Sequence, residues 1–255
     1  MLSRCVAPDF SERAEMEKLK MLQRYIDDSR RIVFFGGAGV STESGIPDFR
    51  SVDGLYNMKY KYPPETILSH NFLYENPSEF YRFYKEKLIF PQVKPNAAHL
   101  KLAELERAGK LSAVVTQNID GLHQMAGSKC VLELHGSVKR NYCIRCQKRY
   151  DGEELPPFDT LPYCTCGGMI RPDVVMYGEA LDDDVVDKAV DAIAVADLLI
   201  IAGTSMSVYP AAGLVQYFRG AHMVIINRTQ TPADSMCDLV INGSLGAVLG
   251  QIVVR

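Results

Sequence analysis

The sequence lacks any long apolar run and carries little net charge. No apolar stretch approaches the roughly 20 residues needed to span a bilayer. The first 20 residues are too charged after position 8 to form the hydrophobic region of a secretory signal. The formal net charge is −3, so no large excess of one sign attracts the chain to nucleic acid or to an anionic membrane. We therefore expect a soluble, cytoplasmic protein with no membrane partner, and nucleic acid is not favoured as a partner.

Cysteine is also scarce, because seven cysteines in 255 residues are too few for a disulfide scaffold. Cys5, Cys130 and Cys237 are scattered, and we interpret them as small apolar residues, with Cys130 in or beside a strand. The other four cysteines fall in two close pairs between positions 143 and 166. Clustering in pairs indicates a metal site rather than disulfides.

The four clustered cysteines have the spacing Cys143-x2-Cys146-x17-Cys164-x-Cys166. This is close to the paired-knuckle pattern of zinc sites, with one intervening residue instead of two in the second pair. Four thiolates complete the tetrahedral shell and leave no position for water or substrate. We therefore predict one structural Zn2+. Basic residues between positions 139 and 149 leave open a zinc-ribbon that binds nucleic acid, although a solvated surface is the commoner explanation.

Short apolar runs alternate with helical patterns along most of the chain, which predicts an α/β fold: a Rossmann-like, mostly parallel sheet with helices on both faces. We divide the chain into an N-terminal helical segment (1–30), a Rossmann-like domain (31–137 and 173–255) with a helical and loop insert (55–96), and a small zinc-ribbon module (138–172). The insert is predicted to pack beside the sheet. The predicted strands are Ile32–Phe35, Ala113–Thr116, Val131–Leu134, Asp173–Tyr177, Leu198–Ala202, Met223–Ile226 and Leu239–Ile241, and the predicted helices are 12–28, 97–108, 182–196, 210–218 and one from about Gly246.

A glycine-rich segment follows the first predicted strand. Gly36-Gly37-Ala38-Gly39 is neither a regular G-x-G-x-x-G motif nor a Walker A loop. Glycines would let backbone amides approach a pyrophosphate, and the N-terminus of a following helix would favour its charge. Arg50 would add a fixed cation.

Polar residues gather where several other predicted strands end, which is where open α/β sheets bind ligands. They occur in Thr116–His123, in Leu134–Gly136, in Gly203–Ser205 and at Asn227. Any one of these groups alone is more often an ordinary loop residue. Four groups at one sheet edge predict a shared ligand crevice.

Several long motifs in the chain resemble those of the sirtuins, the NAD-dependent protein deacylases. They are GAGVSTESGIPDFRS, TQNIDGLH, ELHGS, the paired cysteines, GTSMSVYPA and INRTQTP, in the family's order from about residue 20 to the end. The resemblance implies a Rossmann-like domain with a small zinc module. It also implies NAD as a cosubstrate and proteins or peptides with acyl-lysine as the other substrate.

The resemblance further implies which residues form the site. The phosphates and nicotinamide ribose of NAD would contact Ala38, Thr42, Phe49 and Arg50. The same ribose and the carboxamide would be held by Gln117, Asn118, Ile119 and Asp120, with His135 beside them. The adenosine half would meet Thr204, Ser205, Asn227, Arg228 and Leu245. An extended substrate peptide, added as a strand, would lie between Val174, Gly178 and Glu179 on one side and Val208 and Tyr209 on the other.

The chemistry implied by the resemblance places His135 as the general base. The acyl-lysine carbonyl oxygen attacks the anomeric carbon of the nicotinamide ribose, and nicotinamide leaves. Neutral His135 then accepts a proton from a ribose hydroxyl, which attacks the imidate carbon. Phe49 shields the cationic sugar from water, and Asn118 orients ribose hydroxyls or the hydrolytic water. The products are free lysine, nicotinamide and O-acyl-ADP-ribose.

The segment Phe80–Lys85 bears on the acyl group. Sirtuins that prefer succinyl or malonyl lysine resemble one another in a Tyr-x-x-Arg pair in this helix. Here Tyr84 stands at the arginine position, and Arg82 would face another direction on a helix. We therefore expect neutral acyl groups, acetyl first, with longer chains also accepted.

Three other activities remain open from the sequence. Protein mono-ADP-ribosyltransfer could proceed from the same intermediate. An NAD-dependent oxidoreductase would share the Rossmann-like features, and a nucleic-acid-binding zinc ribbon would show steeply salt-dependent affinity.

Overall fold

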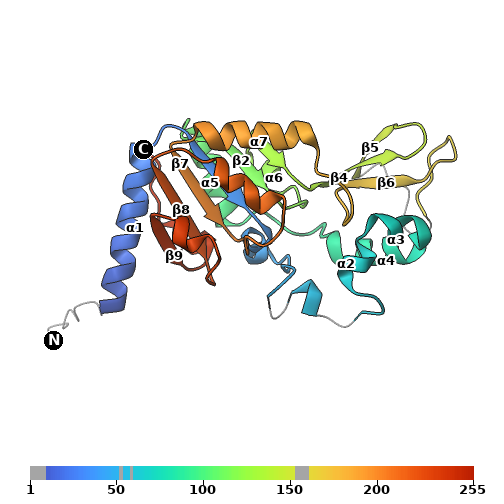
Figure 1. Cartoon of the computed structure of the whole chain (residues 1–255), viewed down its shortest axis with the longest axis horizontal. Coiled ribbons are helices and arrows are strands. Elements are labelled where there is room, and N and C mark those ends of the chain that lie inside the picture. Colours follow the sequence, from blue (N-terminus) through green and yellow to red (C-terminus); the bar gives the residue numbers. More distant parts are fainter. Residues whose placement is uncertain (1–9, 52–53, 58–59, 153–160) are drawn as a thin grey trace.

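The computed structural model describes residues 10–51, 54–57, 60–152 and 161–255. Cys5 therefore lies outside the described residues. Figure 1 shows the long helix α1 (Phe10–Asp28) at one end of the molecule and a small sheet with short helices at the other. No helix among the described residues is long and apolar enough to cross a membrane.

A six-stranded parallel sheet forms the larger part of the molecule, in the order β3-β2-β1-β7-β8-β9. This confirms the predicted Rossmann-like α/β architecture. Most predicted strands coincide with observed ones to within one or two residues. The strands are β1 (Ile32–Gly36), β2 (Leu111–Thr116), β3 (Val131–Glu133), β7 (Leu198–Ala202), β8 (His222–Asn227) and β9 (Leu239–Asn242).

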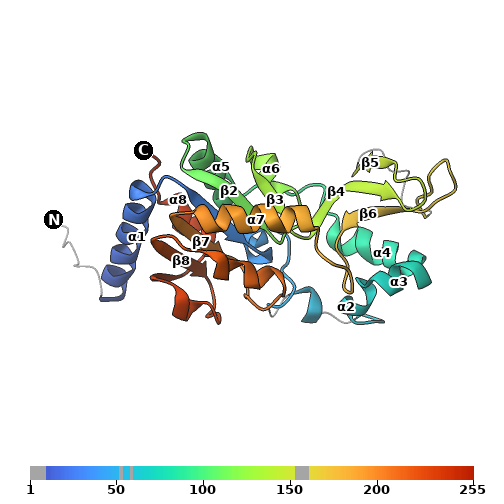
Figure 2. The ribbon, with the colours of Figure 1, turned by 45° about the horizontal axis from the view of Figure 1, so that its top comes forward.

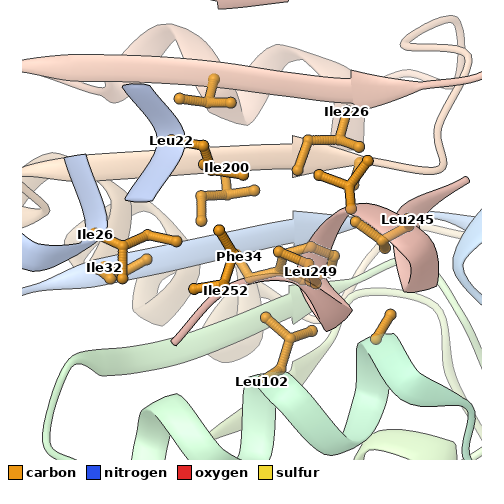
Figure 3. Packing of buried hydrophobic residues seen from close by; sticks show 14 of the residues in the cluster. Leu22, Ile26, Ile32, Phe34, Leu102, Ile200, Ile226, Leu245, Leu249 and Ile252 are labelled. Carbon is orange, nitrogen blue, oxygen red and sulfur yellow. The ribbon is translucent and has the colours of Figure 1, made fainter. Parts of the chain in front are cut away.

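Helices cover both faces of this sheet, so its central strands are apolar on both sides. All five residues of β1 are buried. Ile32 and Phe34 pack on one face with α1, α5 (Ala97–Arg107) and α8 (Leu245–Gly250), as the close view in Figure 3 shows. Val33 and Phe35 pack on the other face with α7 (Asp183–Val195). The alternation follows from the two-residue period of a strand.

A small antiparallel sheet in the order β5-β4-β6 carries the cysteine pairs. Its strands are β4 (Gly136–Cys143), β5 (Arg149–Asp151) and β6 (Ile170–Val174). The prediction that Asp173–Tyr177 is a strand of the main sheet was wrong. The strand ends at Val174 and pairs with Gly136 of β4. Its apolar residues do not reveal which sheet it joins, because that depends on a partner far away in the sequence.

The helical insert packs against the small sheet rather than beside the large one, which corrects a second prediction. It contains α2 (Pro64–Ile67), α3 (His70–Glu75) and α4 (Pro77–Leu88). Its aromatic and aliphatic side chains form one buried cluster with Met169, Val174 and Met176. Figures 1 and 2 show α2–α4 next to β4 and β6 at the end of the molecule far from α1.

The other helices differ from expectation in detail. The predicted helix 210–218 is a 3-10 helix over Ala211–Tyr217. The short α6 (Leu122–Ala126), which follows left-handed Gly121, was not predicted. The observed α5, α7 and α8 agree with their predicted positions to within a residue or two.

Candidate active site

A cleft of about 1060 Å³ opens at the carboxyl ends of β1, β2, β7 and β8 and extends to the end of β6. Its wall includes every residue assigned by resemblance to NAD or to the peptide. The structure therefore brings these separate segments together, as the crevice rule for parallel sheets predicts. The nucleotide-side members are Ala38, Thr42, Phe49, Arg50, Gln117, Asn118, Ile119, Asp120, His135, Thr204, Ser205, Asn227, Arg228 and Leu245.

The glycine-rich loop after β1 is fastened to the loop after β7. The Gly37 amide donates to the Ala202 carbonyl at 3.2 Å, and the Gly39 amide donates to the Gly203 carbonyl at 2.8 Å. A Cβ on Gly39 would lie 2.8 Å from Gly203 Cα, and Gly203 itself has a φ of +58°. These glycines therefore serve a backbone-to-backbone contact between two loops, in addition to any approach to phosphate.

No regular helix follows the glycine loop, contrary to the expectation of a helix N-terminus at the pyrophosphate. Two short 3-10 turns, Ala38–Val40 and Thr42–Ser44, take its place. Gly45 ends the second turn in the left-handed region, with φ of +93°, and Pro47 follows shortly after. The chain then continues as an irregular segment that includes Phe49 and Arg50.

A buried chain of hydrogen bonds connects Asn118, Ser41 and Asp120. Asn118 Nδ2 donates to Ser41 Oγ at 3.0 Å, and Ser41 Oγ donates to Asp120 Oδ2 at 2.6 Å. Ser41 is only 1% exposed yet belongs to the cleft wall. The sequence reasoning missed Ser41, although its place between Gly39 and Thr42 in the longest motif was a usable signal.

His135 is fixed in one tautomer by the backbone. Its Nδ1 lies 2.9 Å from the Gln117 carbonyl oxygen. Because a carbonyl can only accept, Nδ1 carries the proton and Nε2 keeps a free electron pair. Burial lowers the pKa of the His135 imidazole, and the hydrogen bond to Gln117 offsets only part of that effect. The ring is therefore neutral and able to accept a proton at neutral pH.

Side-chain amides connect the strand ends on the adenosine side. Gln117 Nε2 donates to Thr204 Oγ1 at 3.1 Å, and Asn227 Nδ2 donates to the Thr204 carbonyl at 2.8 Å. These bonds connect the carboxyl ends of β2, β7 and β8 to one another at the cleft. Ser205 is exposed and bonds to Ser207 at 2.7 Å, so its hydroxyl is accessible from solvent.

The residues predicted to flank the peptide lie on two sides of the cleft. Val174, Gly178 and Glu179 belong to the end of β6 and the loop after it, and Val208 and Tyr209 follow β7. Tyr209 is 71% exposed, which suits a residue at an entrance. The small sheet and the insert α2–α4 together form what we call the small lobe. Inside it the carboxylate of Glu179 bonds to Arg171 and His70, so the assigned contact of Glu179 with the peptide stays a prediction.

An apolar part of the cleft wall was not predicted from the sequence. It comes from the helical insert and the segments next to it, and consists of Ile46, Leu55, Leu68, Leu88 and Phe90. The available signal was the richness of the insert in aromatic and aliphatic residues. Tyr84 is buried within that lobe, and its hydroxyl has no partner among the described residues.

The four cysteines form a compact cluster at the tip of the small sheet. Their sulfur atoms all lie within 4.8 Å of one another, with Cys143 and Cys166 3.4 Å apart and Cys146 and Cys164 3.6 Å apart. Four sulfurs around Zn2+ at about 2.3 Å would be roughly 3.8 Å apart, so the donor set fits tetrahedral zinc. Tyr150 adds a hydroxyl bond to Cys164 Sγ at 3.1 Å. The cluster is separate from the cleft, since none of its cysteines belongs to the cleft wall that the structure describes.

Comparison with known proteins identifies the family. The Sir2 family model matches residues 37–210. An NAD-dependent protein deacetylase of Clostridium perfringens is 58% identical over 241 residues, which cover 93% of this chain and 99% of that protein. A similarly named protein of Clostridium acetobutylicum is 53% identical over 242 residues, with 93% and 99% covered.

Solved structures of Sir2 proteins superpose closely on the chain. A complex with a p53 peptide and NAD+ is 42% identical, has a TM-score of 0.81, and covers 91% of this chain and 96% of the other. A His-to-Ala variant with deacetylated p53 peptide and 3′-O-acetyl ADP ribose is 42% identical, with a TM-score of 0.83 and the same coverage. With this likeness over nearly the whole length, and with the family's motifs gathered around one cleft, the chain belongs to the Sir2 family.

Proposed function

We propose that this protein is an NAD-dependent protein-lysine deacetylase that moves the acetyl group of a modified lysine onto ADP-ribose. The observation that carries the proposal is the cleft wall, which unites the nucleotide-side residues, His135 and the two peptide-side segments. The relatives named as deacetylases and the Sir2 complexes with peptide and NAD+ support the same activity.

NAD would lie across the ends of β1, β2, β7 and β8. Bound NAD supplies the ribose that accepts the acyl group and the nicotinamide that leaves. Arg50 contributes a cation to the cleft wall, and Gln117 and Asn227 are already oriented by their bonds to Thr204. Since these amides are fixed before any ligand arrives, little rotational freedom is lost on binding.

His135 acts as the general base. Nδ1 is committed to the Gln117 carbonyl, so Nε2 is the atom that accepts a proton from the ribose hydroxyl. Burial keeps the ring neutral, which is the form required for this step. Asn118, held through Ser41 to Asp120, orients ribose hydroxyls or water next to the base. Phe49 excludes water from the reacting sugar.

Neutral acyl groups are the preferred substrates. In α4 the position of a carboxylate-binding arginine is occupied by Tyr84, which is 1% exposed within the insert cluster. Arg82 is fully on the surface and bonds to Glu79. A succinyl carboxylate would enter an apolar part of the cleft with no cationic partner from this helix, and such burial is costly. The aliphatic wall formed by Ile46, Leu55 and Leu88 suits acetyl and longer alkyl chains.

The zinc supports the small lobe rather than the chemistry, because four thiolates leave no open coordination position. Four cysteines that can hold zinc and form no disulfide suit the reducing cytoplasm, where we place the enzyme.

The test is nicotinamide release from NAD with acetyl-, succinyl- and myristoyl-lysine peptides, with O-acetyl-ADP-ribose and free lysine identified by mass spectrometry. We expect acetyl peptides to react and His135→Ala to reduce turnover by about 10²- to 10⁴-fold while NAD still binds. His222→Ala is the matched control, because His222 stacks on Tyr25 away from the cleft.

Other outcomes of this experiment would overturn the proposal. Label transferred from NAD onto protein would indicate mono-ADP-ribosyltransfer. A change at the nicotinamide absorption band without nicotinamide release would indicate an oxidoreductase. Full turnover by His135→Ala would exclude the general-base role.

A further inference from the structure

The segment from Val174 to Glu179 forms one wall of the cleft, and a buried arginine is hydrogen-bonded to both of its ends. Arg171, in β6, is 4% exposed. Its guanidinium meets the Glu179 carboxylate with two bonds, Nη1 to Oε1 at 2.6 Å and Nη2 to Oε2 at 2.9 Å. A paired, two-point contact of this kind fixes direction as well as distance. The Arg171–Glu179 ion pair, which we call the clasp, therefore closes the loop between β6 and Glu179.

Further bonds connect the clasp to the backbone of the same segment. Arg171 Nη2 donates to the Val174 carbonyl at 2.9 Å, and the Met176 amide donates to Glu179 Oε2 at 2.9 Å. The Tyr177 amide and carbonyl bond to Leu68 and His70 of the insert. Hydrogen bonds therefore hold the loop backbone at Val174, Met176 and Tyr177. Val174 and Gly178 of the same loop belong to the cleft wall.

The insert adds a third contact to the clasp. His70 Nδ1 lies 2.7 Å from Glu179 Oε1, and because an ionised carboxylate only accepts, Nδ1 carries a proton. Burial alone would raise the pKa of Glu179, but the bonds from Arg171, His70 and Met176 outweigh it and lower the pKa to about 2. Glu179 is therefore ionised at every pH at which the enzyme would work.

We infer that Arg171 and Glu179 are positioning residues for the acyl-lysine peptide, and that through them the zinc-bearing sheet sets the geometry of the peptide-binding edge. Arg171 directly follows Ile170, which pairs with Cys143 in β4. Strand β6 and the Arg171–Glu179 ion pair thus connect the metal cluster to this wall of the cleft. Neither residue touches the reacting atoms. The inference rests on the proposed function, because it assumes that the wall from Val174 to Gly178 receives the substrate peptide.

The test uses Glu179→Gln, which keeps the shape of the side chain but removes its charge and one acceptor. We expect the KM for an acetyl-lysine peptide to rise about tenfold, while kcat and the KM for NAD change less than about twofold. His70→Ala should give the same pattern on a smaller scale and should keep the fold, because the His70 side chain is half exposed.

The matched control is Glu79→Gln, which removes a carboxylate from the surface pair with Arg82 in the same lobe. It should leave all three constants unchanged. Zinc content and the affinity for a fluorescent acetyl-lysine peptide are measured on every variant, so that peptide positioning is read independently of turnover. Zinc should remain at one ion per chain in Glu179→Gln, and its peptide affinity should fall about tenfold.

Equal losses in the constants for NAD and for peptide would overturn the inference, since a general structural defect has that effect. Unchanged peptide affinity in Glu179→Gln would also overturn it. If the unaltered enzyme binds the peptide but does not deacetylate it, the proposed function fails while the positioning role is still decided by the binding data. If it does not bind the peptide at all, both fail.

Discussion

The hydrogen bond from His135 to the Gln117 carbonyl decides which nitrogen can act as a base. A sequence can indicate that a histidine lies near a strand end, but the tautomer depends on a carbonyl 18 residues away. The same holds for Ser41, whose role between Asn118 and Asp120 requires that the segment after β1 and the segment after β2 lie together. Residue types at the site were therefore predictable from motifs, whereas the hydrogen bonds that orient them were not.

The state of His135 leads to a prediction about pH. The neutral ring is the active form, and burial lowers its pKa below the ordinary value of 6.5. Activity should therefore persist below pH 6.5 and fall only as the pH drops through the lowered pKa. A pH profile of kcat/KM for the peptide reports the free enzyme and measures this limb. An acid limb centred above pH 6.5 would contradict the assignment.

Two other histidines, His99 and His123, are buried, and they should make the free energy of unfolding depend on pH. His99 and His123 pack with ring centroids 4.7 Å apart. Burial lowers the pKa of His99 to about 4 and that of His123 to about 3. The unfolded chain binds protons below about pH 6.5 while the native rings stay neutral. The two neutral histidines thus make their full contribution to the free energy of unfolding above pH 6.5. That contribution is lost as the pH falls toward about 4 for His99 and about 3 for His123.

Urea unfolding at several pH values between 7 and 5 measures this effect. Each histidine should add up to about 1.4 kcal/mol of destabilisation per pH unit at the limit. His123→Phe should flatten the slope, and it loses no hydrogen bond, because neither ring nitrogen of His123 has a partner among the described residues. His222→Ala, at a partly exposed position, should keep the original slope. An unchanged slope in His123→Phe would disprove the explanation.

At the scale of elements, local patterns were informative where a segment is apolar throughout. The predicted strand Leu198–Ala202 coincides with β7, because both faces of this strand are buried. The segment Asp173–Tyr177 is also mostly apolar in sequence, but its first two residues end an antiparallel strand of the small sheet. The placement of the insert α2–α4 failed for the same reason. Periodicity shows that an element is buried, but it does not show against which neighbour.

The metal cluster should be essential to the small sheet. Cys143→Ala removes one of four sulfurs, and we expect zinc to be lost and the sheet β4–β6 to unfold, since few apolar side chains pack around the cluster itself. Metal analysis and near-ultraviolet circular dichroism measure the two effects. Cys237→Ala, which changes a thiol outside the cluster, should retain one zinc per chain. Full activity without metal in Cys143→Ala would contradict the structural role.

At the scale of the whole molecule, the cleft is lined by two parts that have separate hydrophobic clusters. Val174 and Gly178 come from the small lobe, whereas Val208 and Tyr209 come from the loop after β7. Within the described residues, the chain passes between these two parts near Gly136, near Val174 and at the two ends of the insert. A ligand that touches both sides therefore acts as an additional connection between them.

Hydrogen exchange can detect that connection. An acetyl-lysine peptide, added with NAD, should slow exchange in residues 174–178 and in residues 208–209 together, because each side gains contacts with the same strand. The unmodified peptide serves as the control and should give weaker protection. Protection confined to one side would show that the peptide does not bridge the two parts.

The composition of the small lobe also has a consequence for synthesis on the ribosome. The aromatic side chains of α4 finish their buried cluster with Met169, Val174 and Met176, which are translated roughly 80 residues later. At about 5–20 residues per second, this interval lasts several seconds. During that time Phe80, Phe83 and Tyr84 lack the part of their cluster that Met169, Val174 and Met176 supply. The lobe thus completes its folding only late in translation, and until then the insert leaves part of its apolar surface exposed to aggregation.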